Sequence, residues 1–511
     1  MCNPVPPSAN GKTWAANEDH EMFLRPVNAL LWLLMVSMPA LAGGTKFQIT
    51  YNQKDYPGPF TGRVYVMLFE NETKRLRQGP DWFHPEPFYS MDVTGWKAGE
   101  PLTMGSGCLG FPVSLEKLPA KTYTVQAVMD LNKGGRSFAT SPGNIYGIIP
   151  RVALGGGDEK SVEIKLDSTW KETAFNETER VKLLSIDSKL LSDFHGKPVR
   201  LRAGVALPEN YGKDLSKKYP TVYEVPGFGG NHFGAFGRLA QGINKLDGLE
   251  AIWVVLDPDC PFGHHVFADS DNNGPYGQAL AKELIPAIEK NFRCVPDARV
   301  VTGHSSGGWS SLWLQVNHPD LFKGVWSTAP DPVDFRDFQR IDLYSAPAVS
   351  MFVDEIGRKR PIARRNNQPV LFYRDFSDME VVMGRGGQLW SFEAVFGPKG
   401  INGQPRPLWD RMSGKVDPAV MKSWERYDIR RLLEKQWIDL APKLKGKIVV
   451  HCGSADTFYL EGAAVLLKES LGRLKSDAIV EIHPGKDHGN LLTQDLRKRM
   501  EKQMRQWLEK P

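Results

Sequence analysis

Cysteine is scarce in this chain, which has five among 511 residues. Cys108, Cys260, Cys294 and Cys452 lie far apart and match neither a C-x-x-C pair nor a zinc-ligand spacing. A chain of this length can bury a core that needs no disulfide to hold it together. We therefore expect isolated cysteines and no cysteine-based metal site, with Cys2 outside the mature protein.

The sequence also lacks an excess of charge of one sign and long hydrophobic runs. The formal net charge is only +5, from 64 basic and 59 acidic side chains. Such a balance indicates no polyanionic partner, so we expect no nucleic-acid binding. The basic run at 358–365 favours a solvated loop over an anion site. Beyond residue 42 no apolar stretch reaches transmembrane length, and we expect no stable membrane insertion.

The first 42 residues are predicted to be a non-structural leader. Arg25 precedes an apolar run at 27–39, and Ala40-Leu-Ala42 then offers a small-x-small cleavage site before Gly43. This pattern is typical of a secretory signal peptide, here over about 22–42. We expect cleavage after Ala42 and a periplasmic or secreted protein.

Residues 44–170 are rich in strand-forming patterns. Alternating or β-branched runs lie at 47–51, 62–69, 123–128 and 161–166, with Gly and Pro between them. No helical period of useful length interrupts them. The pattern predicts an all-β, sandwich-like N-terminal domain without a constellation of catalytic groups.

From residue 178 onward, short apolar runs alternate with helical segments. Strands near 181–186 and 199–207 are expected to join through a hairpin-like turn at His195-Gly196. Further apolar runs follow at 221–225, 251–256, 299–302, 325–326, 447–450 and 479–482. Unbroken apolar strands separated by helices predict a mostly parallel sheet with helices on both faces, here a catalytic domain over 178–511.

The stretch 331–444 breaks this rhythm. It is rich in Arg, Trp, Phe and Pro and falls between two predicted sheet strands. We interpret it as a cap-like insertion that, with the loop 257–275, forms the walls of a substrate pocket. Its tryptophans suit either ligand stacking or the core, and the alternatives stay open for Trp390, Trp409 and Trp424.

A single G-x-S-x-G motif, Gly303-His-Ser-Ser-Gly307, follows the run at 299–302 and opens a periodic helix near Trp309. Such a strand-to-helix turn needs small flanking residues and holds its central serine above the sheet edge. The motif therefore predicts Ser305 as a nucleophile. The N–H of Ser306, at the helix start, is the predicted first oxyanion-hole donor.

A serine hydroxyl needs a base to take its proton, and in this motif's context the order along the chain is Ser, acid, His. Asp456 follows the strand at 447–450, and His488 follows the last strand at 479–482. These two are the predicted acid and base. Asp331 follows an earlier strand and is the alternative acid.

The loop 226–230, Pro-Gly-Phe-Gly-Gly, follows the strand at 221–225. A Gly-rich turn lets backbone N–H groups approach a substrate, so Phe228 is the predicted second oxyanion donor, with Gly229 as the alternative. Gly229, His304 and Asn273 are the candidates for lining the pocket. Asn273 lies in a segment that resembles the start of a calcium loop but lacks the twelfth-position acid, so no calcium is expected.

These motifs resemble the putative-esterase family of α/β-hydrolases, which includes enterochelin, feruloyl and acetylxylan esterases, esterase D and mycolyltransferases. The likeness runs over about 180–330 and 445–495 and rests on the segments 205–211, 226–230, 277–292 and 303–308. It implies an α/β-hydrolase fold and ester hydrolysis without metal or cofactor. By this resemblance the nucleophile, acid and histidine fall on Ser305, Asp456 and His488. Pro226-Gly227 departs from the His-Gly of many members.

We therefore predict a secreted serine carboxylic-ester hydrolase that forms an acyl-enzyme with a small-molecule or carbohydrate-linked ester. An acyltransferase with the same triad and a carbohydrate-binding or other ligand-binding protein on a hydrolase scaffold are the alternatives. The natural ester and the oligomeric state stay open.

Overall fold

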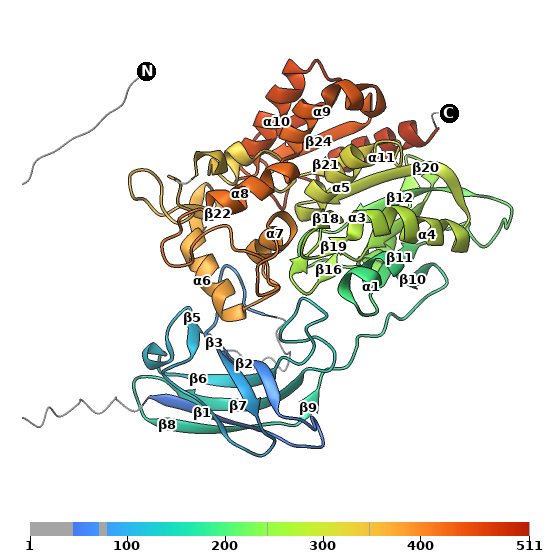
Figure 1. The fold of residues 1–511 in the computed structure, drawn as a ribbon. Helices are drawn as coiled ribbons and strands as arrows, with labels where there is room; N and C mark the ends of the chain where they lie inside the picture. The colour runs from blue at the N-terminus through green and yellow to red at the C-terminus, as the bar shows by residue number, and fades with distance from the viewer. Residues whose placement is uncertain (1–43, 71–78, 243, 347, 510–511) are drawn as a thin grey trace, which may run out of the picture. The chain divides into compact units, whose positions relative to one another are not determined.

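The computed structural model describes residues 44–509 except 71–78, 243 and 347. The described residues belong to one compact unit, and Figure 1 labels its helices and strands. The predicted signal peptide and its cleavage site lie outside the described residues. Within the described part of the chain, no helix is both long enough and apolar enough to cross a membrane.

The N-terminal region contains two β-sheets, a three-stranded sheet in the order β4-β1-β8 and a six-stranded sheet in the order β5-β3-β2-β6-β7-β9. The strands are β1 (Thr45–Tyr51), β2 (Phe60–Phe69), β3 (Phe88–Trp96), β4 (Leu102–Met104), β5 (Leu109–Phe111), β6 (Lys121–Met129), β7 (Ile145–Leu154), β8 (Lys160–Leu166) and β9 (Ser168–Thr169). The predicted strands appear as β1, β2, β6 and β8. The sequence patterns did not predict β3 or β7.

Strand β2 shows why both faces of the larger sheet are covered. Val64, Val66 and Leu68 belong to the core that the two N-terminal sheets share. Tyr65 and Met67, which point to the opposite face, belong to the core of the C-terminal part. Because side chains alternate along a strand, one strand serves both cores, and the N-terminal sheets are joined to the rest of the molecule by buried surface.

The main sheet has eight strands in the order β10-β11-β15-β12-β20-β21-β24-β25. The pairs β10-β11 and β11-β15 are antiparallel and the other neighbours are parallel. These strands are β10 (Val181–Asp187), β11 (Arg200–Ala206), β12 (Tyr219–Val225), β15 (Ile252–Leu256), β20 (Cys294–His304), β21 (Val325–Thr328), β24 (Ile448–Gly453) and β25 (Ile479–His483). The predicted mostly parallel sheet is therefore present, and its parallel strands end at one common edge.

Helices cover both faces of this sheet. Val301 on β20 packs in the same core as Leu312 of α5 (Ser306–Asn317). Its neighbour Val300 packs in the opposite core with Met500 of α11 (Gln494–Glu509). Other helices that flank this sheet are α2 (Gly234–Ala240), α3 (Tyr276–Ala279), α4 (Ile285–Asn291) and α10 (Glu461–Arg473).

The connection between β10 and β11 differs from the prediction. The two strands are antiparallel, as expected, but the helix α1 (Lys189–His195) joins them instead of a hairpin-like turn. The Ser188 hydroxyl accepts a hydrogen bond from the N–H of Leu191, and Gly196 ends the helix with φ 64°. A helix of seven residues is too short to show a clear apolar period, although Ser and Gly are typical end signals.

Residues between β21 and β24 form a largely helical segment with one small hairpin. Its elements are β22 (Pro361–Arg365), β23 (Gln368–Phe372), α6 (Tyr373–Met383), α7 (Gln388–Phe396), α8 (Pro418–Trp424) and α9 (Ile429–Leu444). Trp409 and Trp424 are buried in its core, so their bulk stabilises the fold. In the basic run at 358–365, Arg360 forms an ion pair with Glu355, and Arg364 forms one with Glu461.

The N-terminal sheet caps the end of α6. The last carbonyl groups of a helix have no partners within it, so other groups must satisfy them. The side chains of Arg63, Ser90 and Tyr65 donate hydrogen bonds to the carbonyls of residues 381, 382 and 383, at 2.9, 2.8 and 2.6 Å. Just beyond the helix, Arg385 forms a two-armed ion pair with the buried Asp130. These contacts attach the N-terminal region to the segment between β21 and β24.

Candidate active site

Ser305 is the single residue between β20 and α5, and its backbone has φ 61° and ψ −127°. A non-glycine residue rarely adopts such a conformation, and it is typical of a strained nucleophile turn. The flanking glycines explain how the turn closes. A Cβ on Gly303 would lie 2.0 Å from the carbonyl oxygen of Gly307, and a Cβ on Gly307 would lie 1.9 Å from that of Val225. Only glycine fits at either position.

His488 and Asp456 meet through a hydrogen bond of 2.8 Å between the histidine Nδ1 and the carboxylate Oδ2. Asp456 follows β24, is fully buried, and accepts a second bond from the N–H of Phe458 at 2.8 Å. The carboxylate thus holds the ring in one orientation, and the Nδ1 bond leaves Nε2 available for proton transfer.

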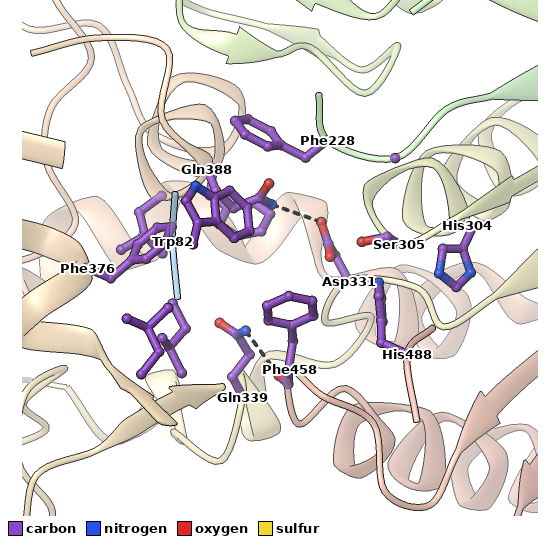
Figure 2. A pocket seen from close by; sticks show the side chains of 15 residues that line it. Trp82, Phe228, His304, Ser305, Asp331, Gln339, Phe376, Gln388, Phe458 and His488 are labelled. Atoms are coloured by element: carbon purple, nitrogen blue, oxygen red, sulfur yellow. Dashed lines mark hydrogen bonds between the residues drawn. The ribbon is translucent and has the colours of Figure 1, made fainter. Parts of the chain in front are cut away.

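Ser305 and His488 line the same cavity, which has a volume of about 290 Å³ (Figure 2). Its walls are mainly apolar, with polar groups near the serine. The lining residues are Trp82, Gly227, Phe228, His304, Ser305, Asp331, Gln339, Ile362, Leu371, Phe376, Gln388, Leu389, Phe392, Phe458 and His488. Apolar walls with a few convergent polar groups are typical of a small-molecule site.

The loop after β12 runs close to Ser305. A Cβ on Gly227 would lie 3.3 Å from the Cβ of Ser305, and Phe228 lines the cavity. The buried His264 fixes the position of this loop, because its Nε2 donates a hydrogen bond to the carbonyl of Pro226 at 2.8 Å. Its Nδ1 accepts the N–H of Val266, and burial lowers the pKa of His264 to about 4, so a neutral ring makes both bonds.

Asp331, the alternative acid, lies in the cavity but bonds to different partners. Its Oδ2 accepts a hydrogen bond from the Ser306 hydroxyl at 2.6 Å. It accepts a second one from the side-chain amide of Gln388 at 3.4 Å, which Figure 2 marks with a dashed line. Burial raises the pKa of Asp331 to about 6. The structure therefore brings Asp456, and not Asp331, into hydrogen-bond contact with His488.

Of the remaining predicted pocket residues, His304 lines the cavity and Gly229 does not. The His304 ring lies 4.5 Å from that of His488, and burial lowers the pKa of His304 to about 3. Gly229 lies just beyond Phe228 in the same loop. The Ser306 residue is buried at the start of α5.

The predicted role of Asn273 and of the loop 257–275 is corrected by the structure. No residue of that loop lines the cavity. Asn273 is buried, where its carbonyl bonds to the His195 ring and its side chain contacts Cys260. The loop folds into short two-residue strand pairs, such as Asp259–Cys260 with Gly263–His264, which turn it back onto the protein. Isolated two-residue pairs leave no periodic signal in a sequence.

Several lining residues had no signal in the sequence. Trp82 comes from the N-terminal region, and its ring lies 5.7 Å from Phe228 and 5.0 Å from Phe376. Gln388 opens α7, and Gln339 donates to the carbonyl of Phe458 at 3.1 Å. No motif surrounds these residues, and only the tertiary structure brings them together. The four described cysteines are free in the structure.

Comparison with known proteins places the chain in a family. The family model described as Putative esterase matches residues 198–489, more than half of the chain. The chain belongs to this family. No curated protein sequence matches the chain significantly.

Comparison with solved structures gives matches to esterases and serine hydrolases, of which three follow. A ferulic acid esterase is 14% identical, with a TM-score of 0.40 over 64% of this chain and 98% of that chain. An S-formylglutathione hydrolase from Agrobacterium tumefaciens is 16% identical, with a TM-score of 0.39 over 66% and 97%. The serine hydrolase FphF from Staphylococcus aureus is 13% identical, with a TM-score of 0.37 over 65% and 98%.

The class of protein is therefore defined. Its membership of this family makes the chain an esterase, and its core is a mostly parallel sheet with helices on both faces. The predicted resemblance is confirmed over the region that carries Ser305, Asp456 and His488.

Proposed function

We propose that the chain hydrolyses esters through a Ser305-His488-Asp456 triad and an acyl-enzyme on Ser305. The observation that carries this proposal is a strained serine in the same cavity as a histidine bonded to a buried carboxylate. His488 Nε2 takes the proton as the Ser305 oxygen attacks the ester carbonyl, and the same nitrogen then gives that proton to the departing alcohol. A water molecule activated by His488 releases the acid.

The oxyanion formed during attack needs hydrogen-bond donors close to Ser305. We assign this role to the backbone N–H groups of Phe228 and Ser306. Phe228 is supported by the close approach of its loop to Ser305, and Ser306 by its place at the start of α5, where the helix dipole favours negative charge. His264 keeps the Phe228 loop in place through the Pro226 carbonyl.

The size and lining of the cavity favour a small ester with a compact apolar or aromatic part. Rings from Trp82, Phe376, Phe392 and Phe458 contribute to its apolar wall. Asp331 and Gln388 supply a polar side that can accept a hydrogen bond from a hydroxyl group. A carboxylate at that place disfavours substrates that carry their own negative charge, so neutral small-molecule or carbohydrate-linked esters are the proposed substrates.

Export is the proposed location, supported by the leader pattern at 22–42. N-terminal sequencing of the protein recovered from the periplasm or medium of its host tests this. A mature chain that starts at Gly43 is expected, and a cytoplasmic protein that retains residues 22–42 would contradict export.

The test of the nucleophile is labelling with a fluorophosphonate probe followed by peptide mass spectrometry. We expect the label on Ser305, and a Ser305→Ala variant should be unlabelled and slower on nitrophenyl esters by about 10⁴-fold or more. Ser216→Ala, which changes an exposed serine, is the matched control and should behave as wild type. Wild-type hydrolysis by Ser305→Ala would refute the proposal.

A further inference from the structure

A second cluster of chemically active side chains lies outside the cavity, on the last two strands of the main sheet. His451 is on β24, and Glu481 and His483 are on β25. His451 is the direct cross-strand neighbour of Glu481, and His483 is two residues beyond Glu481 on the same strand. Since side chains alternate along a strand, all three project from the same face of the sheet.

The donor atoms of the cluster form a tight triangle. His451 Nδ1 lies 2.9 Å from His483 Nε2 and 3.6 Å from Glu481 Oε2, and His483 Nε2 lies 3.7 Å from the same oxygen. Tetrahedral zinc with bonds of about 2.0–2.1 Å holds its ligands about 3.4 Å apart. The three separations bracket that value, so a small movement of the side chains would place all three donors around one ion.

The surroundings of the cluster resemble those of a metal site. Arg499 of α11 binds the other oxygen, Glu481 Oε1, at 2.6 Å, which leaves Oε2 directed at the two histidines. Metal-bound carboxylates are commonly oriented by such outer partners. Trp326 packs 4.5 Å from the His451 ring and closes the site from the inside. His483 and Glu481 are 21% and 37% exposed, which opens a path from solvent and a place for a water ligand.

We propose that His451, Glu481 and His483 form a binding site for a divalent transition-metal ion, with zinc as the best match. Two imidazoles and one carboxylate are a donor set that zinc accepts with an open fourth position. The site goes beyond the proposed function, because no atom of the ester reaction passes through it. An ion there would join β24 to β25, the two strands whose following loops carry Asp456 and His488, and would stabilise the folded protein.

The test is isothermal titration of untagged, chelator-treated protein with zinc chloride, together with thermal unfolding. We expect one zinc ion per chain and a rise in Tm of about 3 °C or more when the free zinc concentration is 100 times the Kd. His483→Ala should weaken binding at least tenfold and abolish the rise in Tm. Glu481→Gln, which keeps the side-chain shape, should also weaken zinc binding. It replaces His483→Ala in the test if His483→Ala folds poorly.

His84→Ala is the matched control, because it removes a histidine that is 76% exposed and lies outside the cluster. It should bind zinc as wild type does. Esterase activity of the zinc-free protein is expected to be the same in wild type and His483→Ala. Activity therefore tests the proposed triad, whereas zinc binding tests the proposed metal site, and either proposal can fail without the other. Absence of stoichiometric binding, or equal binding by wild type and both cluster variants, would overturn the proposal.

Discussion

Two regions of this molecule contribute to the candidate site in different ways. The part that matches the family model, residues 198–489, holds Ser305, Asp456 and His488. The N-terminal region lies outside that match, and among its described residues Trp82 alone lines the cavity. The proposed triad therefore comes from one region, and the other region supplies one residue of the pocket wall. This division predicts that changes in the N-terminal region alter substrate preference or stability while leaving the triad in place.

The largest effect is expected from the acid of the triad. Asp456→Asn should keep the side-chain shape but lower kcat by about 10³–10⁴-fold, because the amide no longer favours the tautomer and charge that His488 needs. Steady-state kinetics on a nitrophenyl ester measure this. The comparison variant is Asp331→Asn, which should retain far more activity. If Asp331→Asn is the more damaging change, the acid has been assigned to the wrong residue.

The next effect concerns the attachment of the two regions. Arg385→Met removes one partner of an ion pair whose other member, Asp130, is only 2% exposed. Leaving that carboxylate unpaired should lower the free energy of unfolding by about 3–5 kcal/mol, measured by urea denaturation. The control is Lys46→Met, which breaks the exposed pair with Glu159 and should cost less than about 1 kcal/mol. Equal costs for the two variants would show that the Arg385 contact does not hold the regions together.

A smaller effect, on stability at different pH values, should follow from Asp331. Its pKa is raised to about 6 in the folded protein by burial, so the folded chain holds this proton more tightly than the unfolded chain does. The Asp331 carboxyl group therefore lowers stability as the pH rises from about 4 to about 6, by on the order of 2 kcal/mol. Asp331→Asn should lose less stability than wild type between those pH values in urea denaturation. An identical pH dependence in both proteins would contradict the assignment.

The smallest effect tests the wall that the N-terminal region supplies. Trp82→Ala should lower kcat/KM about tenfold for esters with long or aromatic acyl groups and change it little for acetate esters, because only the larger groups reach the ring. Trp82→Phe should recover most of the loss. Equal losses on acetate and on larger esters would indicate general disturbance of the site, and no loss on either would remove Trp82 from substrate recognition.

Local patterns were enough to predict the strands of the main sheet and the strand-to-helix turn at Ser305. The glycines around Ser305 carry much of this information, because a Cβ at Gly303 or Gly307 would collide with backbone. By contrast, α1 and the paired segments within 257–275 are too short to produce a period. Asn273 was accordingly expected at the pocket, whereas it lies buried beside Cys260.

The sequence by itself determined the sharp turn at Ser305, since that turn depends mainly on glycines two residues away on either side. Only the tertiary structure decided which distant groups meet. His488 bonds to Asp456 and His451 lies against His483, each pair 32 residues apart, because β24 and β25 are neighbours in the sheet. Trp82 reaches the cavity by packing against Phe228 and Phe376, which lie far from it in the sequence. Such contacts depend on packing between elements, which no local pattern encodes.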